Sequence, residues 1–287
     1  MSEERDHNDF DPEPWSTDLG LAQMINALTP SVAALEEMMF PGAQALSDQM
    51  GEAQRAFADG LKRVLTPVPP QMDLLPALQK LWRDNLPGNW TELTDDQVQE
   101  TAAIMIETGI SLAWVPRHEV VSEIVAKGGE KAIETLLSMA PLVVADLQSA
   151  LAKVADDELA DAAAAAREAL QAFTDGLFRA SQTLSAATLT AVIHEALELK
   201  ALRNAEAAWK RLDPEMAAIS RYRTAAILGT LASALKSYGD RPIPRRFNRH
   251  ATSHSISPRQ LTKANALVAL LCVSSLLVEL QVLADSN

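Results

Sequence analysis

The sequence is poor in glycine, cysteine and aromatic residues. Its 287 residues include 11 glycines and one cysteine, and aromatic residues make up only 5%. The single cysteine, Cys272, excludes an intrachain disulfide, and its apolar neighbours predict a buried side chain. The scarcity of glycine favours helices, as does the abundance of alanine and leucine. No alternating polar and apolar stretch of useful length is present, so we expect no β-sheet.

Two features that direct proteins to membranes are also missing from the sequence. The N-terminus is acidic and lacks the basic and apolar regions of a signal peptide. The longest uncharged apolar run, residues 264–278, contains fifteen residues and falls short of the roughly 18–20 that a membrane helix requires. We therefore expect no membrane span and predict a cytoplasmic location. A helix lying on a membrane surface is the alternative for this apolar run.

Charge is spread unevenly along the chain. The formal net charge is −13, which opposes loose binding to nucleic acid or to an anionic membrane. Residues 1–20 hold seven acids against Arg5, whereas residues 236–263 hold only one acid, Asp240. The basic residues of this second segment are Lys236, Arg241, Arg245, Arg246, Arg249, Arg259 and Lys263. We expect such a local cluster to be able to hold a phosphate group.

Helical periodicity and helix-breaking residues predict an all-α fold in three parts. Residues 1–18 are expected to form a disordered acidic tail, because acids and prolines leave little to bury. Residues 19–155 are expected to form an N-terminal helical region, and residues 156–287 a C-terminal helical bundle. The predicted helices lie within 19–64, 74–84, 119–127, 131–139, 143–155, 215–238 and 258–283, with two long helices between 158 and 209.

One further helix carries a specific start signal. Thr94 is followed by two acids and by Gln97, which is the pattern of a capping box. Apolar residues follow at helical spacing, and Pro116 is expected to end this helix after Trp114.

The last helix is predicted to begin with Ser257 as its cap and Pro258 in its first turn. Its N-terminus would then lie near His254 and offer backbone N–H groups to an anion. Apolar residues occupy nearly all faces of this helix, which indicates burial at the centre of the bundle or in a dimer interface.

The segment PIPRRFNRHATSHS, residues 242–255, resembles the signature of the HEPN superfamily (higher eukaryotes and prokaryotes nucleotide-binding). That motif is an arginine, a polar residue, three variable residues and a histidine, just before the last helix of an α-helical bundle. Arg249, His250 and His254 fill these positions. Many members continue with glycine, whereas this chain has Ser255. Residues 109–117, GISLAWVPR, resemble a stretch in uncharacterised bacterial proteins, which implies no function.

The HEPN resemblance implies a metal-independent ribonuclease of a toxin, antiphage defence or stress response, with two motifs paired across a homodimer. Cleavage of RNA by its own 2′-hydroxyl needs an acid, a base and a cation. Histidine, with a pKa of about 6.5, supplies the first two, and the arginine fork supplies the cation. His254 would be the acid–base and Arg249 the phosphate clamp. The other predicted residues are Asn248 and His250, which would orient substrate or share proton transfer, and Arg245, Arg246 and Arg259, which would bind the RNA backbone.

Three other interpretations of this segment remain open. Its arginines could form a solvated basic turn paired with the acidic body of the protein. The bundle could be a non-catalytic interaction or regulatory module that binds a protein or a nucleotide, and the N-terminal helices could sense a partner. His250 and His254, four residues apart, could bind a metal, but no third ligand is near and the surroundings are cationic, so we expect no metal and no cofactor.

Overall fold

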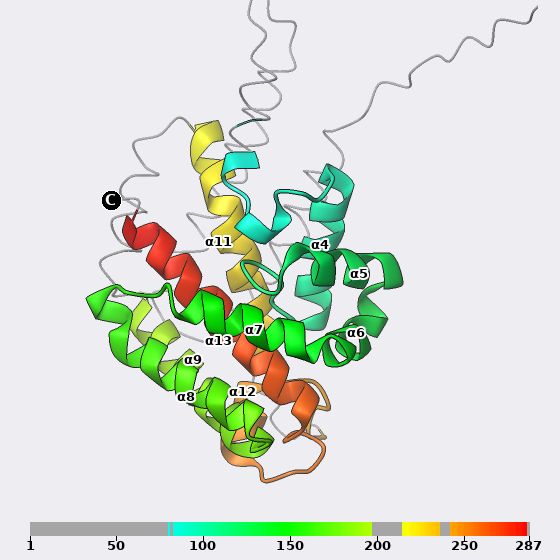
Figure 1. Cartoon of the computed structure of the whole chain (residues 1–287), viewed down its shortest axis with the longest axis vertical. Coiled ribbons are helices and arrows are strands. Elements are labelled where there is room, and N and C mark those ends of the chain that lie inside the picture. Colours follow the sequence, from blue (N-terminus) through cyan, green and yellow to red (C-terminus); the bar gives the residue numbers. More distant parts are fainter. Residues whose placement is uncertain (1–79, 81–82, 197–213, 236–241, 286–287) are drawn as a thin grey trace, which may run out of the picture.

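The computed structural model describes residues 80, 83–196, 214–235 and 242–285 (Figure 1). The predicted acidic tail, the helices expected over 19–64 and most of the helix expected over 74–84 lie outside the described residues. Within the described ranges, every regular element is a helix and no residue lies in a β-strand, which confirms the predicted all-α class. The division at residues 155 and 156 stays a prediction.

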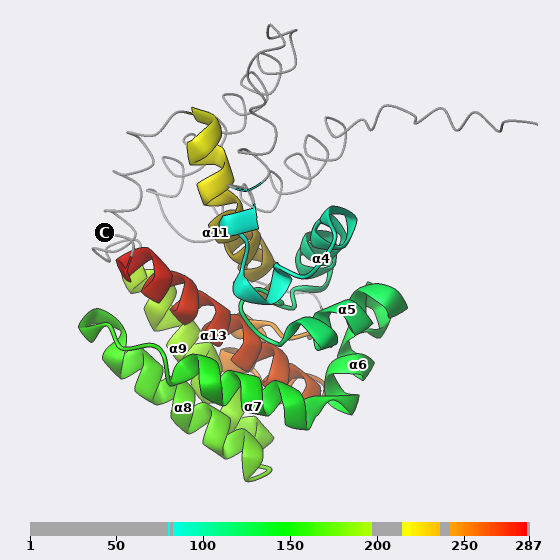
Figure 2. The same cartoon turned by 45° about the horizontal axis from the view of Figure 1, so that its top comes forward.

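A long apolar helix, α13 (Lys263–Asp285), forms the centre of the fold. It packs against α9 (Phe178–Ala196), α8 (Ala160–Thr174) and α7 (Ala140–Leu151). Helices α8 and α9 form a hairpin whose turn contains Gly176 in the left-handed region, at φ 80°. Figures 1 and 2 show α13 passing between this hairpin and α11 (Pro214–Leu235). The core is mostly aliphatic, as the scarcity of aromatic residues requires.

Figure 2 shows α4 (Asp95–Thr108) and α5 (His118–Lys127) on the other side of α13 from the hairpin. Helix α4 packs against α11 and against α5. Helix α6 (Ala132–Ser138) joins α5 to α7, and the short 3-10 helices η1 (Gly88–Trp90), η2 (Gly129–Lys131) and η3 (Asp157–Leu159) complete the connections. The six-residue helix α12 (Arg249–His254) lies beside α9 and is described with the site.

Helix α4 begins as predicted and ends earlier than predicted. Thr94 and Gln97 form the expected capping box, with each side chain accepting from the other residue's backbone N–H. The helix then stops at Thr108, because Gly109 adopts a left-handed conformation at φ 72° and closes the last turn onto Met105. The prediction that Pro116 ends this helix was wrong, since residues 109–117 form an irregular segment instead.

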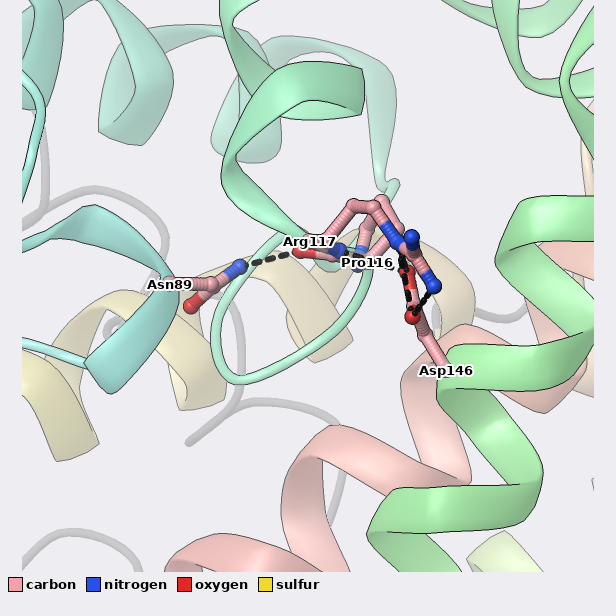
Figure 3. A network of polar contacts seen from close by, with 4 residues as sticks. All are labelled: Asn89, Pro116, Arg117 and Asp146. Atoms are coloured by element: carbon pink, nitrogen blue, oxygen red, sulfur yellow. Dashed lines mark hydrogen bonds and ion pairs between the residues drawn. The ribbon is translucent and has the colours of Figure 1, made fainter.

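The irregular segment, residues 109–117, is held by side chains from other elements. Asn89 Nδ2 donates to the carbonyl oxygens of Leu112 and Pro116, at 2.8 and 2.6 Å. Arg117 ends the segment and forms a two-pronged ion pair with Asp146 of α7, with distances from 2.6 to 3.0 Å (Figure 3). These contacts replace the backbone hydrogen bonds that a helix would have supplied.

Trp114 carries the same segment into the core. Its φ is 68°, a left-handed value that is uncommon for residues other than glycine. Its indole Nε1 donates to Glu279 Oε2 at 2.9 Å, and the Arg223 guanidinium lies 4.9 Å from its ring centroid. Arg223 also donates to Glu279 at 2.6 Å, and both charged side chains are buried. This ion pair therefore ties α11, α13 and residues 109–117 together.

The start of α13 was predicted wrongly. The helix begins at Lys263, and the residues from Ser257 to Leu261 form a turn in which Gln260 and Leu261 both donate to the Ser257 carbonyl. The capping role belongs to Thr262, whose hydroxyl accepts from the backbone N–H of Asn265 at 3.1 Å.

Helix α13 is 23 residues long and reaches a mean hydropathy of 2.3, so by length and composition it could cross a membrane. The uncharged run of residues 264–278 lies within this longer helix, and the expectation of no membrane span stays a prediction. Within the protein, 83% of its most apolar window is buried. A buried core helix passes the same length test. Cys272 lies in this packed interior, and burial raises the pKa of its thiol to about 12.

Candidate phosphate-binding site

The predicted motif folds into α12, a helix of only six residues. Asn248 precedes it in an extended conformation, and its side-chain Oδ1 accepts from the Ala251 backbone N–H at 2.8 Å. This is an N-cap interaction, and Asn248 is buried. A single helical turn and a half is unstable alone, because nucleation fixes many dihedral angles for few hydrogen bonds. The surrounding protein must therefore hold α12 in place.

Thr252 supplies the main attachment of α12 to the bundle. Its hydroxyl accepts from Gln182 Nε2 of α9 at 2.9 Å and from Gln260 Nε2 at 3.3 Å. The same hydroxyl donates to the Asn248 carbonyl at 2.9 Å. A threonine hydroxyl has one donor and two acceptor positions, so its hydrogen-bonding capacity is filled. Thr252, Gln182 and Gln260 are all buried, and we call the side chains of Gln182 and Gln260 the amide clamp.

The chain on both sides of α12 is fixed by α13. Asn265 Nδ2 donates to the Arg245 carbonyl at 3.0 Å and to the Gln260 carbonyl at 2.7 Å. Gln260 Nε2 also donates to the Asn248 carbonyl at 3.0 Å. Buried amide side chains therefore hold the segments before and after the short helix at a fixed separation.

The opposite side of α12 carries the predicted chemistry, and we call the side chains of Arg249, His250 and His254 the motif face. The two imidazole rings are in contact, with centroids 4.5 Å apart and planes tilted by 47°. His254 is exposed and His250 is partly buried. Burial, followed by the charges of His254 and Arg249, lowers the pKa of His250 below its ordinary value of 6.5. His250 is therefore neutral around neutral pH and able to accept a proton.

Arg249 is oriented without being neutralised. Its Nε donates to the Thr190 hydroxyl of α9 at 2.7 Å. Across residues 80, 83–196, 214–235 and 242–285, no carboxylate forms an ion pair with it, and its two Nη atoms make no hydrogen bond. One edge of the guanidinium is thus anchored, while the terminal edge keeps the donors that bind a phosphate oxygen pair.

The three arginines predicted to bind the RNA backbone are exposed around α12. Arg246 Nη1 donates to the Glu107 carbonyl at the end of α4, at 2.8 Å, which fixes one of them above that helix. Arg259 lies in the turn after α12, and Arg245 lies before it. The sequence contains no aspartate or glutamate between Asp240 and Glu279, so this whole segment concentrates positive charge. Arg241 lies outside the described residues.

The sequence predictions missed the residues that hold the motif: Gln182, Thr190, Thr252, Gln260 and Asn265. Thr252 was treated as a variable position of the motif. Gln182 and Thr190 belong to α9, which is far away in sequence and lies beside α12 only after folding. A weak signal existed, because Gln260 and Asn265 are amide residues at the start of an otherwise apolar segment.

In the part of the chain that the structure describes, no three histidine, cysteine, aspartate or glutamate side chains gather in a geometry that could hold a metal ion. Comparisons with protein families, with curated proteins and with solved structures find no match for this chain. The geometry of α12 and its surroundings is therefore the basis for any functional assignment.

Proposed function

We propose that the protein is a metal-independent endoribonuclease of the HEPN type, in which the motif face of α12 binds and cleaves a phosphodiester. The observation that carries this proposal is the contact between the imidazoles of His250 and His254 on α12. Arg249 directly precedes His250, and its Nη donors face no carboxylate among the described residues. Proton donor, proton acceptor and phosphate ligand thereby occur within six residues.

Each group has a defined task in this reaction. A neutral imidazole removes the proton of the 2′-hydroxyl, whose oxygen attacks phosphorus and displaces the 5′-oxygen of the next nucleotide. A protonated imidazole gives its proton to that leaving oxygen, so that a 2′,3′-cyclic phosphate and a 5′-hydroxyl result. The lowered pKa of His250 suits it to the first step, and the exposed His254 is the acid. Arg249 stabilises the charge that develops on the phosphate oxygens.

The structure changes the predicted role of Asn248. Sequence reasoning gave its side chain a place beside the substrate, yet its Oδ1 caps α12 and the residue is buried. We therefore assign Asn248 to positioning the motif rather than to touching RNA. Arg245, Arg246 and Arg259 are exposed and keep their proposed role as contacts to the RNA backbone.

The wider setting follows from the same proposal. Two copies would bring two motif faces together in a homodimer, so that one strand lies across both, as in the HEPN proteins that this chain resembles. The acidic remainder of the protein would limit binding of other nucleic acids by repulsion. We further propose a cytoplasmic toxin, antiphage defence or stress-response role, in which the N-terminal region receives a signal or a regulatory protein.

The test uses the purified full-length chain, single-stranded RNA and a metal chelator. We expect the wild type to release products with cyclic phosphate ends, and His254→Ala to lower the rate about 10²- to 10⁴-fold. Arg249→Ala should lower it by a similar factor, because the developing charge loses its partner. The matched controls are His118→Ala on α5 and Arg167→Ala on α8, which should cleave at the wild-type rate. Equal rates in all five proteins, or no cleavage by the wild type, would refute the proposal.

The second candidate function is a non-catalytic interaction module. Two contacts favour it: Asn248, the residue before the motif, is used as a cap, and Arg249 Nε is committed to Thr190. Such a module would still bind a single-stranded RNA through its cationic segment and would release it at high salt, but it would leave the strand intact. Binding without product formation in the same assay is the result that identifies this function.

A further inference from the structure

The inference concerns the residue that holds the motif face in position, and its activity readout rests on the function proposed above. Ala251 and Thr252 form the buried side of α12, whereas Ser253 and His254 are exposed. A helix of six residues has no second turn to resist rotation about its own axis. Contacts from residues outside α12 must therefore fix the positions of the two imidazoles and the guanidinium.

We propose that Thr252 is a positioning residue whose hydroxyl, held by the amide clamp of Gln182 and Gln260, sets the rotation of α12 and the placement of the motif face. The clamp approaches Thr252 from two elements, because Gln182 belongs to α9 and Gln260 to the turn before α13. Hydrogen bonds from two directions fix the position of the Thr252 hydroxyl, whereas a single hydrogen bond would allow α12 to rotate about it.

The hydrogen bonds of the clamp are connected to the reactive side chains by short covalent paths. Thr252 lies two residues from His250 and two residues from His254. The carbonyl of Asn248, which receives the Thr252 hydroxyl and Gln260 Nε2, belongs to the residue directly before Arg249. A small rotation of Thr252 would therefore move all three side chains of the motif face together.

Packing alone does not explain the choice of residue at position 252. A valine would fill the same volume in this interior but could neither accept from two amides nor donate to a carbonyl. Burying Gln182 and Gln260 costs free energy, because only their Nε2 atoms donate hydrogen bonds and their Oε1 atoms are buried without a partner among the described residues. A connected buried polar group instead specifies one arrangement among several of similar packing.

The test compares Thr252→Val with Thr252→Ser in the full-length chain. Valine removes the hydroxyl and keeps the shape, whereas serine keeps the hydroxyl. We expect Thr252→Val to lower kcat for RNA cleavage by about 10- to 100-fold, with a smaller change in KM, because the reacting groups are displaced while the exposed arginines still bind. Thr252→Ser should restore kcat to the wild-type value.

A second readout does not depend on any activity. Ring-proton NMR of the free protein follows the titration of each histidine. Thr252→Val should move the titration of His250 from its lowered position toward 6.5, because the ring leaves its partly buried contact with His254. Thr252→Ser should leave the titration unchanged. The control is Ser275→Ala, which removes a buried hydrogen bond away from α12, from Ser275 Oγ of α13 to the Ala113 carbonyl at 2.7 Å, and should alter stability alone.

The outcomes separate this inference from the proposed function. If the wild type does not cleave RNA but Thr252→Val shifts the His250 titration, the function fails and the positioning role stands. If the Thr252→Val titration matches the wild type, or if Ser275→Ala shifts it equally, the positioning role is refuted. Should Thr252→Val fail to fold, Gln182→Met removes one arm of the clamp at similar volume and is judged by the same two readouts.

Discussion

Residues 109–117 have no regular helix geometry and residues 245–254 contain only the short helix α12, and polar side chains from other elements hold both segments. In the first segment, the side chains of Asn89 and Ser275 donate hydrogen bonds to backbone carbonyls. In the second, Gln260 and Asn265 do the same. In both segments, side-chain amides or hydroxyls therefore donate the hydrogen bonds that regular backbone pairing would otherwise supply.

The two segments differ in how they treat charge. Arg117, at the end of the first, donates to the Asp146 carboxylate through Nε and Nη2, as Figure 3 shows. In the second, the arginines and histidines stand in a stretch of sequence without acids, and Arg249 is oriented by a hydroxyl. Gathering unneutralised positive charge adds repulsion and no stability. The comparison teaches that the first segment completes the core, whereas the second keeps charge available for an anion.

The largest effect on stability is expected at the buried ion pair beneath residues 109–117. Glu279→Ala should lower the free energy of unfolding by about 3–5 kcal/mol, because it leaves the Arg223 guanidinium buried without its partner. Urea unfolding followed by circular dichroism measures the change. Glu100→Ala, an exposed acid on α4, is the control and should stay within about 0.5 kcal/mol. A loss at Glu279 no greater than the control would remove the structural role given to this segment.

A middle-sized effect is expected where Asn89 holds the same segment. Asn89→Ala should cost about 1–3 kcal/mol, because two backbone carbonyls lose a donor and one of them, at Leu112, keeps a bond from Trp90 Nε1. The same unfolding measurement applies. Thr91→Ala removes an exposed local hydrogen bond to Gly88 and should cost less than about 0.5 kcal/mol. Equal losses would mean that Asn89 does not hold the segment.

The smallest effect is expected in the motif segment, and it depends on pH. The folded protein lowers the pKa of His250, so the unfolded chain binds more protons as pH falls through 6.5. The contribution of His250 is therefore fully present above 6.5, declines below that value and levels off once pH has passed the folded pKa. His250→Gln should remove this decline. Unfolding free energies at about pH 7.5 and about pH 5.5 measure it, with His118→Gln as the control. An unchanged pH dependence in His250→Gln would contradict the environment described for this ring.

Local sequence signals predicted those features that neighbouring residues enforce. The capping box at Thr94 was predicted because both of its partners lie within one helical turn. The burial of Cys272 and of its helix followed from a run of apolar residues on every face. The end of α4 was missed because Gly109 was overlooked in favour of Pro116, although a glycine in the left-handed region ends a helix as firmly as a proline does.

The start of α13 shows the limit of such signals. Ser257 and Pro258 satisfy the local preference for a helix start, yet the chain there forms a turn that lets Gln260 reach Thr252 and Asn248. A hydrogen bond to a buried partner outweighed the local preference. The same holds at Asn248, whose chemistry fits both a substrate contact and a helix cap.

The sequence by itself determined the all-α class, the apolar last helix and the concentration of arginine and histidine in one segment, because each depends on composition or on spacing along the chain. Only the tertiary structure decided which face of α12 is buried, how Thr252 is clamped and which charges remain without an acid partner in the described residues. These features need side chains from α9 and α13 to meet α12, and hydrogen bonds between residues up to 70 positions apart cannot be read from local preference.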